Sequence, residues 1–239
     1  MRLRPTERIG LALLVVVLGC GEPGPDTASS RVVVTAVVTD SISFEPLEAV
    51  DICAVDEAGD SLGCTVSEAD GAVSLSLPPH TRVQVRFDVE GYYPVAGFFE
   101  TEDTDIEASL EARIPSLATI SLIELLAGVE LEEGTGHLMF EAWEEEQVLG
   151  AAGVEVALAP QPASSHQFYA TEDGGLDGDT TTTSSAGLGG IVNLPPGDYD
   201  VTYATSRSCV VNWGWATDAA TALARIEADR ISFLAQLCL

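Results

Sequence analysis

The chain has 239 residues, enough for one large or two small domains, and carries 38 acidic against 10 basic residues for a formal net charge of −28. Such a charge repels nucleic acid and anionic lipid headgroups, so no nucleic-acid partner and no polybasic membrane contact are expected. All basic residues are arginines, and without lysine the chain has no Schiff base, serine–lysine dyad or lysine–asparagine isopeptide bond.

The first thirty residues have the layout of an export signal. Three arginines precede the apolar run Ile9 to Leu18, which is shorter than the ~20 residues of a membrane-spanning helix. The ending Val-Leu-Gly-Cys at Cys20 resembles the lipobox of bacterial lipoproteins. The resemblance implies a signal peptide over residues 1–19, an acylated N-terminal Cys20, and a flexible tether of small residues and prolines over 20–30.

Removal of residues 1–19 takes away three arginines and one glutamate, which leaves 7 basic and 37 acidic residues and a net charge of −30. The expected location is the cell envelope, with the N-terminal lipid as the contact to the membrane. Gly21, rather than aspartate, follows the cysteine, and by resemblance to enterobacterial lipoproteins this implies the outer membrane.

After the tether, apolar and polar residues alternate with a period of two, which is typical of strands with one face on a core and one in water. In the first half this pattern covers residues 32–39, 50–54, 73–77, 82–89 and 106–113. Residues 82–89 place their charged side chains on one face, and we expect that face to lie in solvent.

The second half repeats short strands after an interruption. Residues 116–127 are apolar, follow Pro115 and end at Gly128, which predicts a short helix, although a buried strand fits nearly as well. Further strands are expected at 138–143, 154–158, 199–203 and 230–239. The polar segment between Pro160 and Gly187 is expected to be an extended surface loop.

Four cysteines remain when Cys20 is set aside, and an even number in an exported chain implies two disulfides. Three pairings are open, and we favour the local ones. Cys53 and Cys64 flank a turn that would place them opposite each other, and Cys209 would pair with Cys238.

An internal repeat links the two halves. A polar turn ending in Gly71 precedes the strand AVSLSL and a Pro-Pro turn, and a polar turn ending in Gly187 precedes LGGIVNL and a second Pro-Pro turn. Proline ends each strand because it cannot continue the ladder, and a returning strand follows. His80 stands where the second copy has Gly197, and the pair Gly189-Gly190 adds one residue that would fit a bulge.

This order of turns and strands resembles the carboxypeptidase regulatory-like domain, a seven-stranded, transthyretin-like β-sandwich. The resemblance covers about two thirds of the expected mature chain. It implies an all-β fold of two tandem antiparallel β-sandwich domains, over residues 31–114 and 134–239, joined by a helical or extended linker over 115–133. Domains of that family are non-catalytic, accompany catalytic domains or form arrays on cell surfaces.

Several residues are candidates for a site. Trp213 and Trp215 are candidate ligand-binding residues, although packing against a nearby disulfide is the favoured interpretation. Asp173, Asp177 and Asp179 are candidate calcium ligands in an acidic loop, which otherwise is a solvated surface. The three histidines, at positions 80, 137 and 166, lack the spacing of a zinc site, and no serine lies in a nucleophile elbow.

The sequence therefore predicts a non-enzymatic cell-envelope lipoprotein without a cofactor and with a structural or adhesive role. Two alternatives stay open. The first is a module that binds an extracellular protein, peptide or carbohydrate, and the second is an accessory subunit of a separate surface enzyme.

Overall fold

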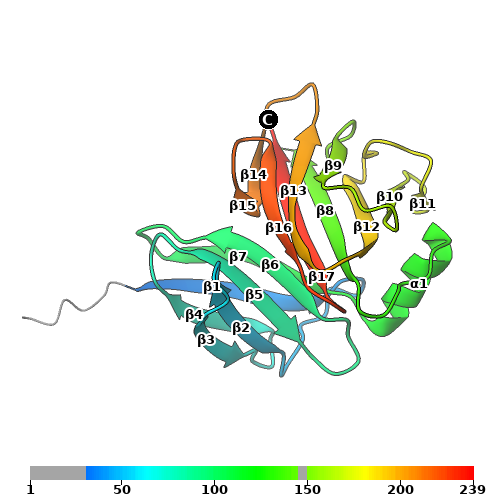
Figure 1. The fold of residues 1–239 in the computed structure, drawn as a ribbon. Coiled ribbons are helices and arrows are strands. Elements are labelled where there is room, and N and C mark those ends of the chain that lie inside the picture. The colour runs from blue at the N-terminus through cyan, green and yellow to red at the C-terminus, as the bar shows by residue number, and fades with distance from the viewer. Residues whose placement is uncertain (1–30, 145–149) are drawn as a thin grey trace, which may run out of the picture.

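The computed structural model describes residues 31–144 and 150–239, except for the side chains of residues 107–111. The predicted signal peptide, Cys20 and the tether lie outside the described residues. The described chain is almost entirely β-structure, as predicted, and a helix that connects its two halves in sequence lies at the right of Figure 1. No helix in the described residues is long and apolar enough to cross a membrane.

The first half is a sandwich of two sheets, in the strand orders β4-β1-β7 and β6-β5-β2-β3. Most neighbours are antiparallel, and β1 and β7 are parallel. Valine, leucine, isoleucine and phenylalanine side chains from both sheets pack into one core. Its strands are β1 (Val32–Asp40), β2 (Asp51–Asp56), β3 (Ser61–Val66), β4 (Ala72–Leu77), β5 (Arg82–Asp88), β6 (Val95–Glu100) and β7 (Ile106–Ile114).

The second half repeats this plan with additions. Its sheets contain β12-β8-β17, in which β8 and β17 are parallel, and β15-β16-β13-β9. A second apolar core lies between them. The strands are β8 (Gly136–Glu144), β9 (Glu155–Ala159), β10 (His166–Ala170), β11 (Leu176–Asp177), β12 (Leu188–Leu194), β13 (Gly197–Ala204), β14 (Cys209–Trp213), β15 (Trp215–Ala216), β16 (Thr221–Ile226) and β17 (Ile231–Cys238).

One sheet runs through both halves. Its ten strands follow the order β11-β10-β12-β8-β17-β6-β5-β2-β3, with β14 also paired to β17. The first part of β17, Ile231–Phe233, pairs in parallel with β6 of the first half, and its last part pairs with β14. Backbone hydrogen bonds therefore join the two sandwiches directly, as Figure 1 shows where β17 and β6 meet.

The internal repeat is preserved in its hydrogen bonds. Ser67 donates its hydroxyl to the Leu47 carbonyl (2.7 Å) and accepts from the Val50 amide (2.9 Å). Thr183 makes the same two bonds in the second half, to Ala151 (2.6 Å) and from Val154 (3.0 Å). Each hydroxyl, four residues before the repeat glycine, ties that turn to the residues just before the upstream strand, β2 or β9.

The two repeat glycines have positive φ and lie close to the backbone of the first strand of their half, β1 or β8. A Cβ on Gly71 (φ 76°) would lie 2.4 Å from the Val38 carbonyl oxygen, and one on Gly187 (φ 68°) would lie 2.2 Å from that of Ala142. The glycine carbonyl in turn accepts from the same strand residue, at 2.9 and 2.7 Å. Only glycine combines this φ with this approach.

Every strand named from the alternation is confirmed, but several strands were missed. β6, β14, β15 and β16 were not predicted, and β10 and β11 lie inside the segment 160–187 that was expected to be loop. The expected position of the bulge was also wrong, because the register of β12 on β8 shifts between Ile191 and Leu194, around Asn193 (φ 60°), and not at Gly189-Gly190. Both of those glycines instead lie against aromatic and methionine side chains.

The predicted helix is confirmed as α1 (Leu117–Ala127). Ser116 caps its start by accepting from the Thr119 amide at 3.1 Å, and Gly128, in the left-handed conformation, ends it. Ile120 is the buried residue of this helix, and Ile123 packs partly against the first core. The domain boundaries at residues 31, 115 and 134 stay predictions.

Both local disulfides are confirmed. Cys53–Cys64 joins directly opposed residues of β2 and β3, and Cys209–Cys238 joins directly opposed residues of β14 and β17. Each disulfide ties an outer strand, β3 or β14, to the one strand with which it pairs. On the chain-entropy model each contributes about 3–4 kcal/mol.

Candidate functional site at the joint between the halves

The two predicted tryptophans do not share one exposed face. Trp215 is fully buried, and its indole N–H donates to the Val83 carbonyl of the first half at 3.1 Å. Its ring meets that of Phe98 edge-on, with centroids 5.2 Å apart. Trp213 is half-buried beside Phe99, with centroids 6.3 Å apart. Both indoles thus pack against strands of the other half.

These tryptophans belong to the segment Cys209–Ala216, which contains β14 and β15 and which we name the clamp hairpin for the turn at Gly214; the two strands do not pair with each other, since β14 pairs with β17 and β15 with β16. The disulfide to Cys238 ties its start to β17. At its turn the Gly214 amide donates to the Phe98 carbonyl of β6 (2.9 Å). The clamp hairpin is therefore bonded to both halves, and its two tryptophans pack against Phe98 and Phe99 of β6.

The polar face of β5 lies against the second half and not in solvent. This face carries every second residue of the strand, Arg82, Gln84, Arg86 and Asp88. Gln84 is completely buried. The expectation that this face is solvated was therefore wrong. Alternation marks the two faces of a strand but does not distinguish water from a second domain as the neighbour of the polar face.

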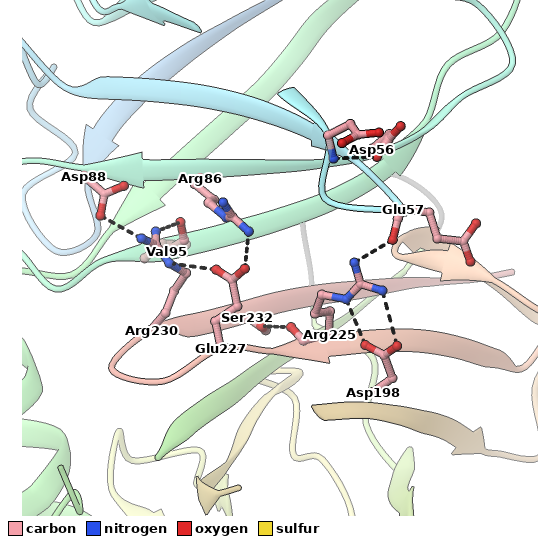
Figure 2. Close-up of polar contacts among 11 residues, drawn as sticks. Asp56, Glu57, Arg86, Asp88, Val95, Asp198, Arg225, Glu227, Arg230 and Ser232 are labelled. Atoms are coloured by element: carbon pink, nitrogen blue, oxygen red, sulfur yellow. Dashed lines mark hydrogen bonds and ion pairs between the residues drawn. The ribbon is translucent and has the colours of Figure 1, made fainter. Parts of the chain in front are cut away.

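Glu227 lies between two arginines of the joint, at the left in Figure 2. One carboxylate oxygen pairs with Arg86 of β5, and the other lies 3.2 Å from Nε of Arg230. Arg230 also pairs with Asp88 at 2.8 Å and donates to the Val95 carbonyl at 3.0 Å. Charged groups from both halves alternate along this line, so each charge has a partner of opposite sign.

Arg225 forms a second part of the joint, to the right of Glu227 in Figure 2. It binds Asp198 through two nitrogens, at 2.9 and 3.3 Å, and donates to the Glu57 carbonyl of the first half at 2.7 Å. Its guanidinium lies 5.4 Å from the centre of the Trp215 ring. The hydrogen bond that Arg225 donates to Asp198 raises the pKa of Arg225, so this cation stays charged at any ordinary pH.

His137 is a third contact between the halves. It is fully buried on β8, its Nε2 lies 3.0 Å from the Tyr93 hydroxyl, and its Nδ1 accepts from the Asn193 amide at 3.3 Å. Burial lowers the pKa of His137 to about 4, against a smaller opposing effect of Asp229 and Glu124. The ring is neutral at pH 7, and its Nε2–H donates to Tyr93, whose own pKa burial raises.

The remaining predicted site residues lie on the surface. Asp173 accepts from the Thr171 hydroxyl and Asp177 from the Asp179 amide (2.8 Å), and these bonds lower the pKa of both carboxyls. In residues 31–144 and 150–239 no three acidic, histidine or cysteine side chains come together as metal ligands would. His80 forms an exposed ion pair with Asp103 (2.8 Å), and His166 is exposed on β10.

A surface depression lies where the Asp56–Ala58 turn meets the start of β5. His80, Thr81, Arg82 and Glu100 complete its lining. Arg82 pairs with Glu57 (3.3 Å) and donates to the Ala216 carbonyl (3.1 Å), so this depression borders the joint. Of the charged residues that line it, Arg82 bonds the clamp hairpin to the first half.

Sequence reasoning missed the joint arginines. The sequence contained one signal for them, the small number of arginines. Only seven follow residue 20, and four of these are Arg82, Arg86, Arg225 and Arg230. In a chain with so many carboxylates, a cation on the polar face of a strand marks a place where acidic segments meet.

No protein-family model and no curated protein match the chain. Among solved structures it is similar to the TIE protein of Bacillus anthracis, at 12% identity and a TM-score of 0.30, with 87% of this chain and 34% of that chain covered. It therefore spans about a third of that protein's length. It is also similar to the minor pilin of Streptococcus agalactiae (12% identity, TM-score 0.28, 87% and 96% covered) and to a shaft pilin of Lactobacillus rhamnosus GG (12%, 0.26, 88% and 98%). These likenesses assign the chain to no family.

Proposed function

We propose that the chain is a non-enzymatic, lipid-anchored protein of the cell envelope, in which two rigidly joined β-sandwiches form a structural or adhesive unit. The observation that carries this proposal is the joint. The β6–β17 ladder, the clamp hairpin and the line of arginines and carboxylates bond the halves to each other at several separate places. A two-domain unit held in this way transmits force and keeps its surface loops at fixed positions.

The disulfides support an exported location. Cys64 is exposed, and a bond of this kind persists in an oxidising compartment but is reduced in a cytosol. The acidic composition, with its net charge of −28, favours solubility and cationic partners in that compartment.

The anchor is tested by fractionating bacteria that express the full chain and measuring the intact mass of the extracted protein. We expect a chain that begins at Cys20, carries added acyl mass and lacks four thiol hydrogens. The Cys20→Ala variant should keep residues 1–19 and carry no acyl group, and Thr27→Ala is the matched control in the same segment. An unacylated wild-type chain would contradict the proposal.

The structural or adhesive role is tested in cells that carry the gene deletion. Complementation with the wild-type chain should restore surface attachment or envelope integrity, and complementation with Trp215→Ala, which keeps the anchor segment but opens the joint, should restore less of it. Full complementation by Trp215→Ala would show that the joint is not needed.

A further inference from the structure

Helix α1 presents an unpartnered apolar face to solvent. The fractional exposures of its leucines are 53% for Leu117, 48% for Leu122, 76% for Leu125 and 42% for Leu126. Ala118 and Ser121 complete the same face, since these positions are four apart in two rows along the helix. The opposite face, with Ile120 and Ile123, packs on the protein. A soluble surface helix normally shows the reverse pattern, with polar residues outward.

The two rows have the geometry of a helix-packing surface. Leu117, Ser121 and Leu125 form one ridge with a spacing of four residues, and Ala118, Leu122 and Leu126 form the next. The groove between such ridges accepts a ridge of a second helix. The small residues Ala118 and Ser121 allow close approach near the middle of the face.

Acidic residues lie in the segments that adjoin this helix. At the start of the helix the Leu117 amide donates to the Gly91 carbonyl, and Glu90 is the residue before Gly91. At the end of the helix Glu124 accepts from the Leu131 amide (3.0 Å). This bond folds the exposed segment that follows, with Glu130, Glu132 and Glu133, back toward the helix. The helix also lies against β11, as Figure 1 shows at the right of the molecule. The segment around β11 contributes the acidic residues Glu172, Asp173, Asp177 and Asp179.

Negative charge at the end of this helix destabilises the helix itself. Its carbonyl end carries partial negative charge, there is no basic residue in its last turn, and the segment that follows adds three glutamates. Neither the helix and the residues that follow it, 117–135, nor the adjoining segments 90–93 and 171–180 contain an arginine. A cation supplied by a partner would relieve this repulsion.

We propose that the exposed face of α1 is the docking site for a cationic amphipathic helix of another envelope protein, with leucine-like residues in the groove and lysine or arginine on the acidic rim. A second copy of this chain fits less well, because it would bring a second acidic rim to the same contact. A bilayer with anionic headgroups is repelled for the same reason. The inference rests on the proposed function only in that the chain acts by contact with other components of the envelope.

The test uses the expected mature chain, residues 20–239, with Cys20→Ser, which retains every described residue. The probe is a fluorescein-labelled synthetic peptide of leucine and lysine patterned as an amphipathic helix, and a scrambled peptide of the same composition is the control. Binding is measured by fluorescence anisotropy. We expect the scrambled peptide to bind about tenfold more weakly or worse, because it cannot present apolar residues and charge on separate faces.

Two pairs of variants separate the apolar and the acidic parts. Leu122→Ser with Leu125→Ser should weaken binding about ten- to a hundredfold, whereas Val33→Ser with Val210→Ser, exposed elsewhere, should change it less than about twofold. Glu132→Gln with Glu133→Gln should weaken binding about threefold or more at low salt, and the control is Glu155→Gln with Asp200→Asn.

Equal binding of both peptides, or no effect of the leucine substitutions, would overturn the proposal. So would sedimentation that shows a dimer lost in the leucine variant, which would assign the face to a second copy. Flotation with phosphatidylcholine vesicles that depends on the same leucines would assign it to a bilayer. None of these outcomes bears on acylation of Cys20, so the anchor and the docking site fail separately.

Discussion

The two halves follow one strand plan and differ where the fifth and sixth strands connect. In the first half residues 89–94 join β5 to β6, whereas in the second half residues 205–220 join the equivalent β13 and β16. The longer connection contains the clamp hairpin, its disulfide and both of its tryptophans. The repeated part of the sequence therefore builds the two sandwiches, and the part without a counterpart joins them.

A second difference concerns the third strand of each half. β3 pairs with β2 and extends the sheet that contains β5, whereas β10 pairs with β12 and extends the other sheet. The Cys53–Cys64 disulfide ties β3 to β2, and the second half has no cysteine at the equivalent strands β9 and β10. The same repeat thus tolerates either placement of its third strand, since the repeat's hydrogen bonds involve the neighbouring turns and not this strand.

The largest expected effect comes from removing the indole that links the halves. Trp215→Ala should lower the free energy of unfolding by about 3–5 kcal/mol, because it leaves a cavity in a closed core and an unpaired Val83 carbonyl. Urea denaturation followed by circular dichroism measures this. If the clamp hairpin couples the halves, the single transition of the wild type should separate into two.

Trp143→Ala is the matched control, since Trp143 is half-buried on β8 and its N–H donates to Glu141 (2.7 Å), not to the other half. Trp143→Ala should lower the free energy of unfolding by less than Trp215→Ala does, and unfolding should remain a single transition. Comparable losses in both variants would show that indole burial in general, and not the link between the halves, sets the stability.

The next effect is a dependence on pH from His137. The folded chain binds the imidazole proton only near pH 4, whereas the unfolded chain binds it near 6.5. The contribution to stability is therefore complete above pH 6.5 and is lost as the pH falls toward 4, by about 3 kcal/mol in total. Urea denaturation at pH 7 and pH 4.5 should show most of this loss at the lower pH.

His137→Gln isolates this dependence from that of the carboxylates, which both chains share. The difference between wild type and variant should shrink steadily as the pH falls from 7 to 4.5. A difference that stays constant would mean that His137 titrates normally in the folded chain, and so that water reaches its contact with Tyr93.

Periodicity and glycine placement made most of the fold predictable. Alternation marked β1, β4, β5 and β13 because each has one face on a core, and Gly128 marked the end of α1. The strands that were missed lack this contrast. In β6 four consecutive residues, Val95 to Phe98, are buried because the second half covers the face that would otherwise be polar.

The joint could not be predicted for the same reason. A polar face covered by a second domain has the same residues as a polar face in water, and Gln84 between two arginines reads as a solvated strand. The tryptophans were noticed, and packing was the favoured interpretation, but their partners Val83, Phe98 and Phe99 lie more than a hundred residues away in the sequence. Such contacts follow from the β6–β17 pairing, which no local pattern shows.

The smallest expected effect separates a joint ion pair from a surface one. Glu227→Gln should lower the free energy of unfolding by about 1–2 kcal/mol, because Arg86 and Arg230 lose a shared carboxylate at a partly buried site. Glu144→Gln, which removes the exposed partner of Arg207 (2.7 Å), should cost at most about 0.5 kcal/mol. Denaturation at two sodium chloride concentrations distinguishes them further, since salt screens exposed charges more strongly than partly buried ones. Equal and equally salt-sensitive losses would mean that solvent enters the joint, and that the β6–β17 ladder and the clamp hairpin hold the halves together without help from the arginines.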